Sequence, residues 1–107
     1  MMFVLNQEIL SVNCGPGVHR KVLAHNEDMM MCEIRFEKGA VGALHAHPHL
    51  QTTYVVSGSF EFTIGDEKKV VKAGDSLLMP PDVLHGTVAL LDGVLVDVFS
   101  PMRKDFL

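Results

Sequence analysis

The sequence predicts an all-β fold, either a β-sandwich or a closed β-barrel, on three observations. Turn-forming residues recur at short intervals along the chain, so only short elements fit between them. The segments between these turns alternate apolar and polar residues, or are rich in β-branched and aromatic residues, as strands are. No long segment keeps the spacing of an amphipathic helix. Many short strands without helices are typical of sandwiches and barrels.

The N-terminal half contains the only helical pattern. Residues 26–31 (Asn-Glu-Asp-Met-Met-Met) have the polar start and apolar continuation of a helical turn. Directly behind them, residues 33–36 alternate between polar and apolar and predict a strand. Residues 52–56 are β-branched or aromatic throughout and predict the next strand.

The second half predicts a hairpin and further strands. Phe60, Phe62 and Ile64 share one face of a strand, and residues 65–67 (Gly-Asp-Glu) form a good hairpin tip. The remaining strands are expected at residues 70–72, 76–79 and 94–99.

Length and charge limit the classes of partner. The chain has 107 residues, which fits one domain over residues 1–107. Its net charge is -4, and no basic run is longer than two residues, as at Lys68-Lys69, so we expect no nucleic-acid partner. Charged residues interrupt every apolar run well short of the roughly 18 residues that a membrane helix needs. We therefore expect no membrane partner.

The N-terminal residues and the cysteines bear on location and assembly. Residues 1–5 lack the basic start of a secretory signal. Cys14 and Cys32 are too few for a disulfide scaffold and fit reduced thiols, although one bridge between them stays open. These features predict a cytoplasmic protein. The apolar residues at positions 3–5 lead us to expect a homodimer formed through strand exchange or sheet packing.

Histidines are concentrated in one short segment. His45, His47, His49 and Gln51 occupy alternate positions and would share one face of an extended strand. Two imidazoles on one strand face can bind a single metal ion. Pro48 disturbs strand pairing, so the shared face is firmest for His45 and His47.

A further ligand is expected from a neighbouring strand. His85 follows the turn at residues 80–82 and is suitably placed in the sequence. Surface histidines, or core histidines that only form hydrogen bonds, are the alternative for an isolated His-x-His pair. We interpret His49 as part of a pocket wall or of the surface.

The spacing around these histidines resembles the two motifs of the cupin family. The first, Gly-x5-His-x-His-x3-Glu-x6-Gly, is followed from Gly39 to Gly58 with its spacing kept throughout. The second, Gly-x5-Pro-x-Gly-x2-His-x3-Asn, is followed from Gly74 to Ala89. The resemblance implies a small antiparallel β-barrel of jelly-roll type (a double-stranded β-helix), in agreement with the strand pattern.

Three positions depart from these motifs. Gln51 replaces the glutamate, Asp82 the glycine and Ala89 the asparagine. We interpret Asp82 as a turn residue that tolerates an unusual backbone angle. A neutral Gln51 beside three imidazoles leaves a divalent ion with its whole charge, which suits Lewis-acid chemistry on an anionic substrate better than oxygen activation. Alternatively, Gln51 only supports the ligands, or is a remnant of a lost site.

Two charged residues near the C-terminal end invite two interpretations each. Asp97 interrupts an apolar strand in which Leu95 and Phe99 share its parity. A buried unpaired carboxylate is costly, so Asp97 there needs a partner or a chemical role; the alternative is an outward-facing residue on an edge strand. Arg103, taken alone, is best explained as a solvated charge.

A closer resemblance extends over most of the chain. Residues 15–23, 36–40, 45–51 and 97–107 are similar to the KdgF group of single-domain cupins, the pectin-degradation proteins. The resemblance implies a metal held by His45, His47, Gln51 and His85. It also implies a catalytic aspartate and arginine at Asp97 and Arg103, with Phe99 and Arg103 in contact with substrate.

The activity implied by this resemblance is the conversion of cyclic 4,5-unsaturated monouronates, from pectin or alginate lyase action, to the linear ketonised sugar acid. The implied cofactor is one divalent ion: nickel, zinc, iron, manganese or copper. Asp97 is expected to be the general base, kept ionised by nearby positive charge. Arg103 is expected to hold a carboxylate bidentately.

Three alternatives stay open. One is a non-enzymatic cupin that binds sugars or anions. Another is a different metal-dependent cupin enzyme, such as a dioxygenase or an isomerase. The third is a structural protein with a vestigial site.

Overall fold

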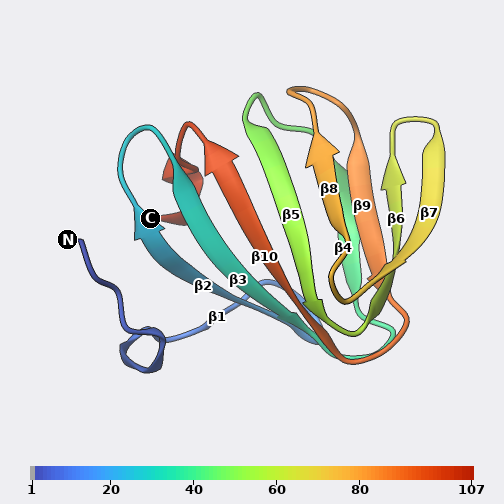
Figure 1. Cartoon of the computed structure of the whole chain (residues 1–107), viewed down its shortest axis with the longest axis horizontal. Coiled ribbons are helices and arrows are strands. Elements are labelled where there is room, and N and C mark those ends of the chain that lie inside the picture. The colour runs from blue at the N-terminus through green and yellow to red at the C-terminus, as the bar shows by residue number, and fades with distance from the viewer. Residues whose placement is uncertain (1) are drawn as a thin grey trace.

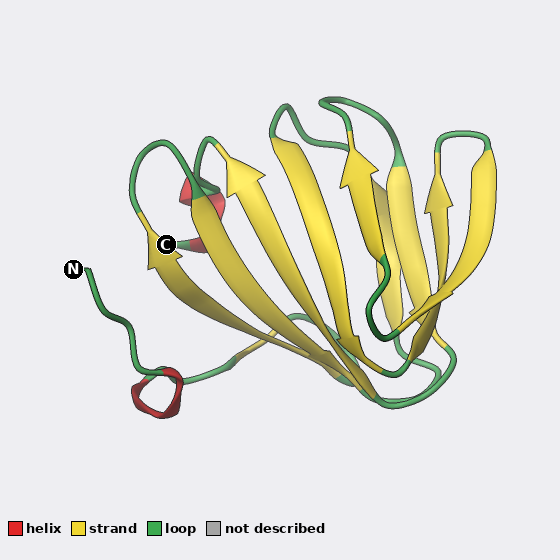
Figure 2. Cartoon of the chain, in the orientation of Figure 1, coloured by secondary structure: helices red, strands yellow, loops and turns green. Residues whose placement is uncertain are grey.

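The computed structural model describes residues 2–107, and strands dominate it (Figures 1 and 2). The only helical elements among these residues are two short 3-10 turns. In chain order the elements are η1 (Asn6–Glu8), β1 (Val12–Asn13), β2 (Val18–His25), β3 (Met30–Phe36), β4 (Val41–His45), β5 (Leu50–Ser57), β6 (Ser59–Ile64), β7 (Glu67–Lys72), β8 (Ser76–Met79), β9 (His85–Ala89), β10 (Gly93–Ser100) and η2 (Lys104–Phe106).

The strands form two antiparallel sheets. One has the order β1-β2-β3-β10-β5-β8 and the other β4-β9-β6-β7. Neighbours in each sheet are mostly distant in the sequence, because the chain crosses from one sheet to the other after β3, β4, β5, β7, β8 and β9. This arrangement confirms the predicted all-β jelly roll.

Alternating burial explains why these residues form strands. In β3, Met30, Cys32, Ile34 and Phe36 are buried while the residues between them face outward. β5 follows the same period-two pattern. Such alternation is what a strand needs when one of its faces covers a core and the other faces water.

The core lies between the two sheets. Phe36 of the larger sheet meets Phe60 of the smaller one edge-to-face, with ring centroids 5.3 Å apart. Phe60, Met30 and Met79 are fully buried. Burying each such side chain stabilises the fold by about 1.5–3 kcal/mol. The core therefore holds together the two layers on which the histidines lie.

The hairpin and the later strands are confirmed, but the helical turn is wrong. Ile64 pairs with Glu67 across the tip at residues 65–66. Residues 26–29 form a tight turn, in which the Asn26 side-chain oxygen accepts hydrogen bonds from the backbone N–H groups of Asp28 (2.9 Å) and Met29 (3.0 Å). Asparagine often forms this local bond in preference to a helix.

The histidine-rich segment is not one strand. β4 ends at His45, residues 46–49 form a connecting loop, and β5 begins at Leu50 in the other sheet. Pro48 has no N–H to donate, so pairing cannot continue through it. Instead, the His47 carbonyl accepts a hydrogen bond of 2.8 Å from the Asp82 N–H in the β8–β9 loop. This crossover carries the chain from one wall of the interior to the other.

Two motif positions have a backbone reason. Gly58, between β5 and β6, has φ +85°, and a Cβ there would lie 2.6 Å from the Asp92 carbonyl oxygen. Only glycine fits this place. Asp82 has φ 64°, which confirms its interpretation as a turn residue.

Both cysteines are free: Cys14 is exposed and Cys32 is buried. Several apolar N-terminal residues are exposed, among them Phe3 and Leu5.

Within residues 2–107, no helix has the length and apolar character needed to span a membrane.

Candidate metal centre and cavity

Three histidines from separate parts of the fold meet at one point. His45 ends β4 and pairs directly with His85, which begins β9, while His47 lies in the loop after β4. One ring nitrogen from each lies within 4.8 Å of the others. The imidazole centroids are 4.4 Å (His45–His85), 4.9 Å (His47–His85) and 5.5 Å (His45–His47) apart.

The Nδ1 atom of each ring is already used. In each residue Nδ1 donates to a backbone carbonyl: His45 to Ala43 (2.8 Å), His47 to His49 (3.1 Å) and His85 to Val83 (3.0 Å). A carbonyl oxygen only accepts, so Nδ1 carries the proton and Nε2 of a neutral ring has a free lone pair. Metal-ligating histidines are oriented in this way.

Two buried atoms lack what a cation would provide. His85 Nε2 is buried with no hydrogen-bond partner among the described residues. His47 Nε2 lies 2.8 Å from Gln51 Oε1. When the ring is neutral and Nδ1 carries the proton, both His47 Nε2 and Gln51 Oε1 are acceptors, so neither can donate to the other. Gln51 cannot simply be reversed, because its amide nitrogen donates to Thr53 Oγ1 (3.1 Å). A positive charge between the two acceptors would satisfy both.

Protonation of His47 is a poor source of that charge. Burial lowers the pKa of both His47 and His85, because a charged imidazole loses hydration there. Neutral imidazoles and an amide oxygen are a donor set that divalent transition metals accept. The residues present therefore fit a metal ion, with three histidines as its core ligands.

Asp97 of β10 lies beside this group on the inner face of the larger sheet. It pairs across the sheet with Thr53, whose hydroxyl donates a hydrogen bond of 2.6 Å to Asp97 Oδ1. Burial is the main influence on this carboxyl and raises its pKa to about 6, against the opposing effects of Thr53 and Arg103. His45 and Arg103 lower this pKa as the nearby positive charge was expected to do, although burial outweighs them, and a pKa of about 6 leaves most of the carboxyl ionised at pH 7.

Arg103 follows β10 and turns back over the cavity. Its Nε and Nη2 donate to the Asp105 carboxylate at 3.1 Å and 2.8 Å. The guanidinium also lies over two rings, 4.2 Å from the centroid of Phe106 and 5.1 Å from that of Phe99. Arg103 holds the pKa of Asp105 below its usual range. The edge of Arg103 best suited to a substrate carboxylate is thus already occupied within the chain.

Phe99 and His49 flank the histidine group. Phe99 is buried, and its ring centroid lies 5.7 Å from those of both His47 and Phe106. His49 is outside the three-histidine group, with its ring 5.4 Å from His47. Its backbone carbonyl accepts from His47 Nδ1 and so helps to orient that ring.

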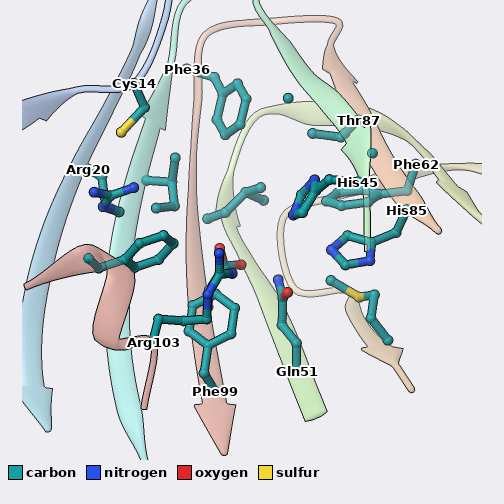
Figure 3. Close-up of a pocket in the computed structure, with 17 residues that line it drawn as sticks. Cys14, Arg20, Phe36, His45, Gln51, Phe62, His85, Thr87, Phe99 and Arg103 are labelled. Carbon is teal, nitrogen blue, oxygen red and sulfur yellow. The ribbon is translucent and has the colours of Figure 1, made fainter. Parts of the chain in front are cut away.

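A cavity of about 260 Å³ lies beside the histidine group, although His47 and His49 are not among the residues that line it (Figure 3). It is lined by His45, Gln51, His85, Asp97, Phe99 and Arg103 from the predicted set, and by Arg20, Phe106 and apolar residues of both sheets. Figure 3 shows His45 and His85 at one side and Arg20 at the other. Pockets for drug-sized ligands are roughly 300–1,000 Å³, so this one suits a smaller molecule.

Sequence reasoning missed three residues here. Thr53 shares the parity of Gln51, two positions before it, which could have placed it on the same inner face of the strand. Arg20 lies between Val18 and Val22 at alternate positions, the same pattern that marked Asp97. Phe106 gave no such signal, because it lies in a turn beyond the last strand.

Comparison with known proteins agrees with this geometry. The family model described as "Cupin domain" matches residues 32–99. The pectin degradation protein KdgF of Dickeya dadantii (strain 3937) is 45% identical over 95 residues, covering 87% of this chain and 86% of that protein.

Solved structures give the same result. KdgF from Halomonas sp. is 41% identical with a TM-score of 0.94, covering 98% of this chain and 97% of the other. An RmlC-like cupin from Shewanella frigidimarina NCIMB 400 is 41% identical with a TM-score of 0.96, covering 100% and 96%. The fold, the three-histidine group and these similarities show that the chain belongs to the cupin family, in its KdgF group.

Proposed function

We propose that this protein is a metal-dependent enzyme that opens the ring of cyclic 4,5-unsaturated monouronates and yields the linear keto acid. The observation that carries the proposal is the connection of the three-histidine group to Asp97 by side-chain contacts through Gln51 and Thr53, beside one cavity. The KdgF relative is described as a pectin degradation protein, and the resemblance to this group implies, as substrates, the unsaturated uronates that pectin lyases release.

The metal site comprises His45, His47 and His85, with Gln51 as the fourth ligand. An ion bound there would supply a Lewis acid that stabilises negative charge developing on substrate oxygen atoms. Gln51 is neutral, so the ligands cancel none of the ion's charge. The Thr53 hydroxyl accepts from the Gln51 amide and thereby keeps its oxygen directed at His47.

Asp97 is the proton carrier. Its carboxylate takes the proton from the C1 hydroxyl of the cyclic hemiacetal, the C1–O5 bond breaks, and C1 becomes an aldehyde. The electron pair stays on O5 as an enolate conjugated with the C6 carboxylate. Return of the proton to C4 gives a ketone at C5, so the product is an isomer of the substrate and no co-reactant is consumed.

Arg103 and Phe99 shape the cavity around the reacting atoms. Asp105 holds Nε and Nη2 of Arg103, so this side chain acts on substrate through its remaining N–H groups and its positive charge. Phe99 packs against both the Arg103 guanidinium and the His47 ring. A 260 Å³ cavity fits a single sugar ring better than an oligosaccharide.

Loss of the ultraviolet absorbance of the unsaturated uronate tests this function. The metal-loaded protein should accelerate the loss, a chelator should abolish the acceleration, and added metal should restore it. Nuclear magnetic resonance should identify the keto acid. An oxygen electrode run in parallel separates the proposal from a dioxygenase. A rate that is unchanged by chelation, or binding without turnover, would contradict the proposal.

We also propose that the protein is a homodimer, and the proposed chemistry does not depend on this assembly. Exposed apolar side chains at the N-terminal end, including Phe3 and Leu5, favour it. Sedimentation equilibrium over a range of concentrations should give twice the chain mass. A monomer at all concentrations would exclude the dimer without affecting the proposed chemistry.

A further inference from the structure

Arg20 is a charged residue on the inner face of the larger sheet. It lies in β2 and pairs with Ile34 of β3, which in turn pairs with Leu95 of β10. Ile34 and Leu95 are buried and line the same cavity as Arg20. The strand register therefore directs the side chain of Arg20 toward the cavity, where it is half-buried beside apolar side chains. A charge that is partly removed from water without a partner is costly.

The guanidinium of Arg20 is held in place without being neutralised. Its central carbon lies 3.7 Å from the centroid of the Phe106 ring. Its Nε is buried and has no hydrogen-bond partner in the described part of the chain. Among residues 2–107, none of the ion pairs and none of the side-chain hydrogen bonds involves Arg20. A stacked guanidinium keeps its N–H fork in a fixed plane, ready for a planar acceptor.

Arg103 provides the contrast within the same cavity. Both arginines contact Phe106, at 3.7 Å for Arg20 and 4.2 Å for Arg103. Arg103 has its acidic partner, because Asp105 accepts from Nε and Nη2. Arg20 has the same stacking but lacks the carboxylate. A ligand bound in the cavity could therefore supply the carboxylate that Arg20 lacks.

We infer that Arg20 is a carboxylate-binding residue, which receives the acid group of a sugar acid at the side of the cavity away from His45 and His85 (Figure 3). The inference rests on the proposed function for the identity of the acid as a uronate. The Arg20 fork fits a carboxylate through two parallel N–H···O bonds. A neutral sugar of the same size would leave the guanidinium unpaired, so Arg20 selects for acids.

Binding of a non-reacting sugar acid tests the inference. Galacturonate has no 4,5 double bond, so its binding is measured without turnover. Titration calorimetry on the metal-loaded protein should show binding of galacturonate and much weaker binding of galactose. Arg20→Gln should bind galacturonate roughly 10- to 100-fold more weakly, the loss expected for a charge-assisted hydrogen-bonded contact. The metal content should equal that of the parent.

A surface arginine provides the matched control. Arg35 lies on the outer side of β3, and its side chain is 61% exposed. Arg35→Gln changes the net charge by the same amount and should leave galacturonate binding unchanged. Arg20→Lys keeps the charge but lacks the fork, and should give an intermediate affinity. If the thermal transition of Arg20→Gln shows that this variant does not fold, the affinity of Arg20→Lys for galacturonate tests the role of Arg20 instead.

The outcomes separate this inference from the proposed function. Parent affinity for galacturonate in both Arg20 variants, or no preference of the parent for galacturonate over galactose, would overturn the role of Arg20. Arg20-dependent binding in a protein that leaves unsaturated uronate intact would overturn the proposed function alone. Turnover by Arg20→Gln with an unchanged KM would overturn the role of Arg20 alone and leave the proposed function intact.

Discussion

Thr53 and Asp97 face each other across β5 and β10, and the Thr53 hydroxyl donates a 2.6 Å hydrogen bond to the Asp97 carboxylate. The same hydroxyl accepts from the amide of Gln51. One threonine thus fixes both the proposed base and the proposed neutral ligand. Its replacement should reveal how much of the site depends on orientation.

Thr53→Val keeps the size of the side chain but removes the hydroxyl. Asp97 loses a donor and Gln51 an acceptor, so we expect a loss of about 1–3 kcal/mol in the free energy of unfolding and a lower kcat in the uronate assay. Thr53→Ser keeps the hydroxyl and is the control. Parent-like stability and kcat in the valine variant would show that the hydrogen bonds at Thr53 do not support the site.

His47→Ala removes one of the three converging imidazoles. We expect metal retention to fall sharply, because two histidines and an amide bind a divalent ion much less tightly than three histidines and an amide. Elemental analysis after dialysis measures the retained ion. His19→Ala, outside the group, should keep the parent metal content. Full occupancy in His47→Ala would remove His47 from the ligand set.

Gln51→Glu places a negative charge in the ligand set. The ion should still bind, but its charge is partly cancelled, so kcat should decrease if the ion acts as a Lewis acid. Steady-state turnover, normalised to metal content, gives the comparison. A variant faster than the parent would refute the argument from the neutral ligand.

Asp97→Asn keeps the shape of the side chain but cannot take a proton. Turnover should fall by roughly 10²- to 10⁴-fold, the range for general acid–base catalysis. Metal content and the thermal transition should change little. Activity close to that of the parent would leave Asp97 without a chemical role and favour the purely structural interpretation of this strand.

Cys32 should be unreactive in the folded protein. Burial, and to a lesser extent Asp97, raises the pKa of its thiol from 9.0 to about 12, so almost no thiolate exists at pH 8. Iodoacetamide at pH 8 should therefore modify Cys14 alone, and mass spectrometry should show one adduct. In denaturant both thiols should react. Two adducts on the native protein would contradict the burial of Cys32.

The raised pKa of Cys32 also predicts how the free energy of unfolding changes with pH. The folded state favours the protonated thiol, so this contribution is complete below about pH 9 and is lost as the pH rises toward 12. Unfolding measured in that range should therefore depend less on pH in Cys32→Ala than in the parent.

Period-two patterns allowed most of the fold to be predicted. Phe60, Phe62 and Ile64 alternate with polar residues, and residues 94–99 are rich in β-branched residues, so both strands follow from local sequence, as does the hairpin after Ile64. The 26–31 segment failed because the Asn26 side chain closes a turn with the backbone, which a count of apolar residues does not reveal. The 45–51 segment failed as one strand because Pro48 separates two strands of different sheets.

The site was predictable only in part. Its histidines, with Gln51, follow a motif spacing, and the structure brings them together although β4 and β5 lie in different sheets. The ion pair of Arg103 with Asp105 and the unpaired state of Arg20 depend on where side chains meet in space. Neither can be derived from strand parity, because η2 and its approach to β2 are tertiary features.

Because the chain crosses between the sheets at residues 46–49, the proposed ligands come from both sheets. His45 and His85 belong to the smaller sheet, whereas Gln51 belongs to the larger one. An ion bound by all of them would join the two sheets as a cross-link does, in addition to the apolar core. Free metal at a hundredfold excess over its Kd would add about 2.7 kcal/mol to the free energy of unfolding. Metal supply would then govern the lifetime of the protein as well as its activity, and a shortage of metal would expose it to proteolysis.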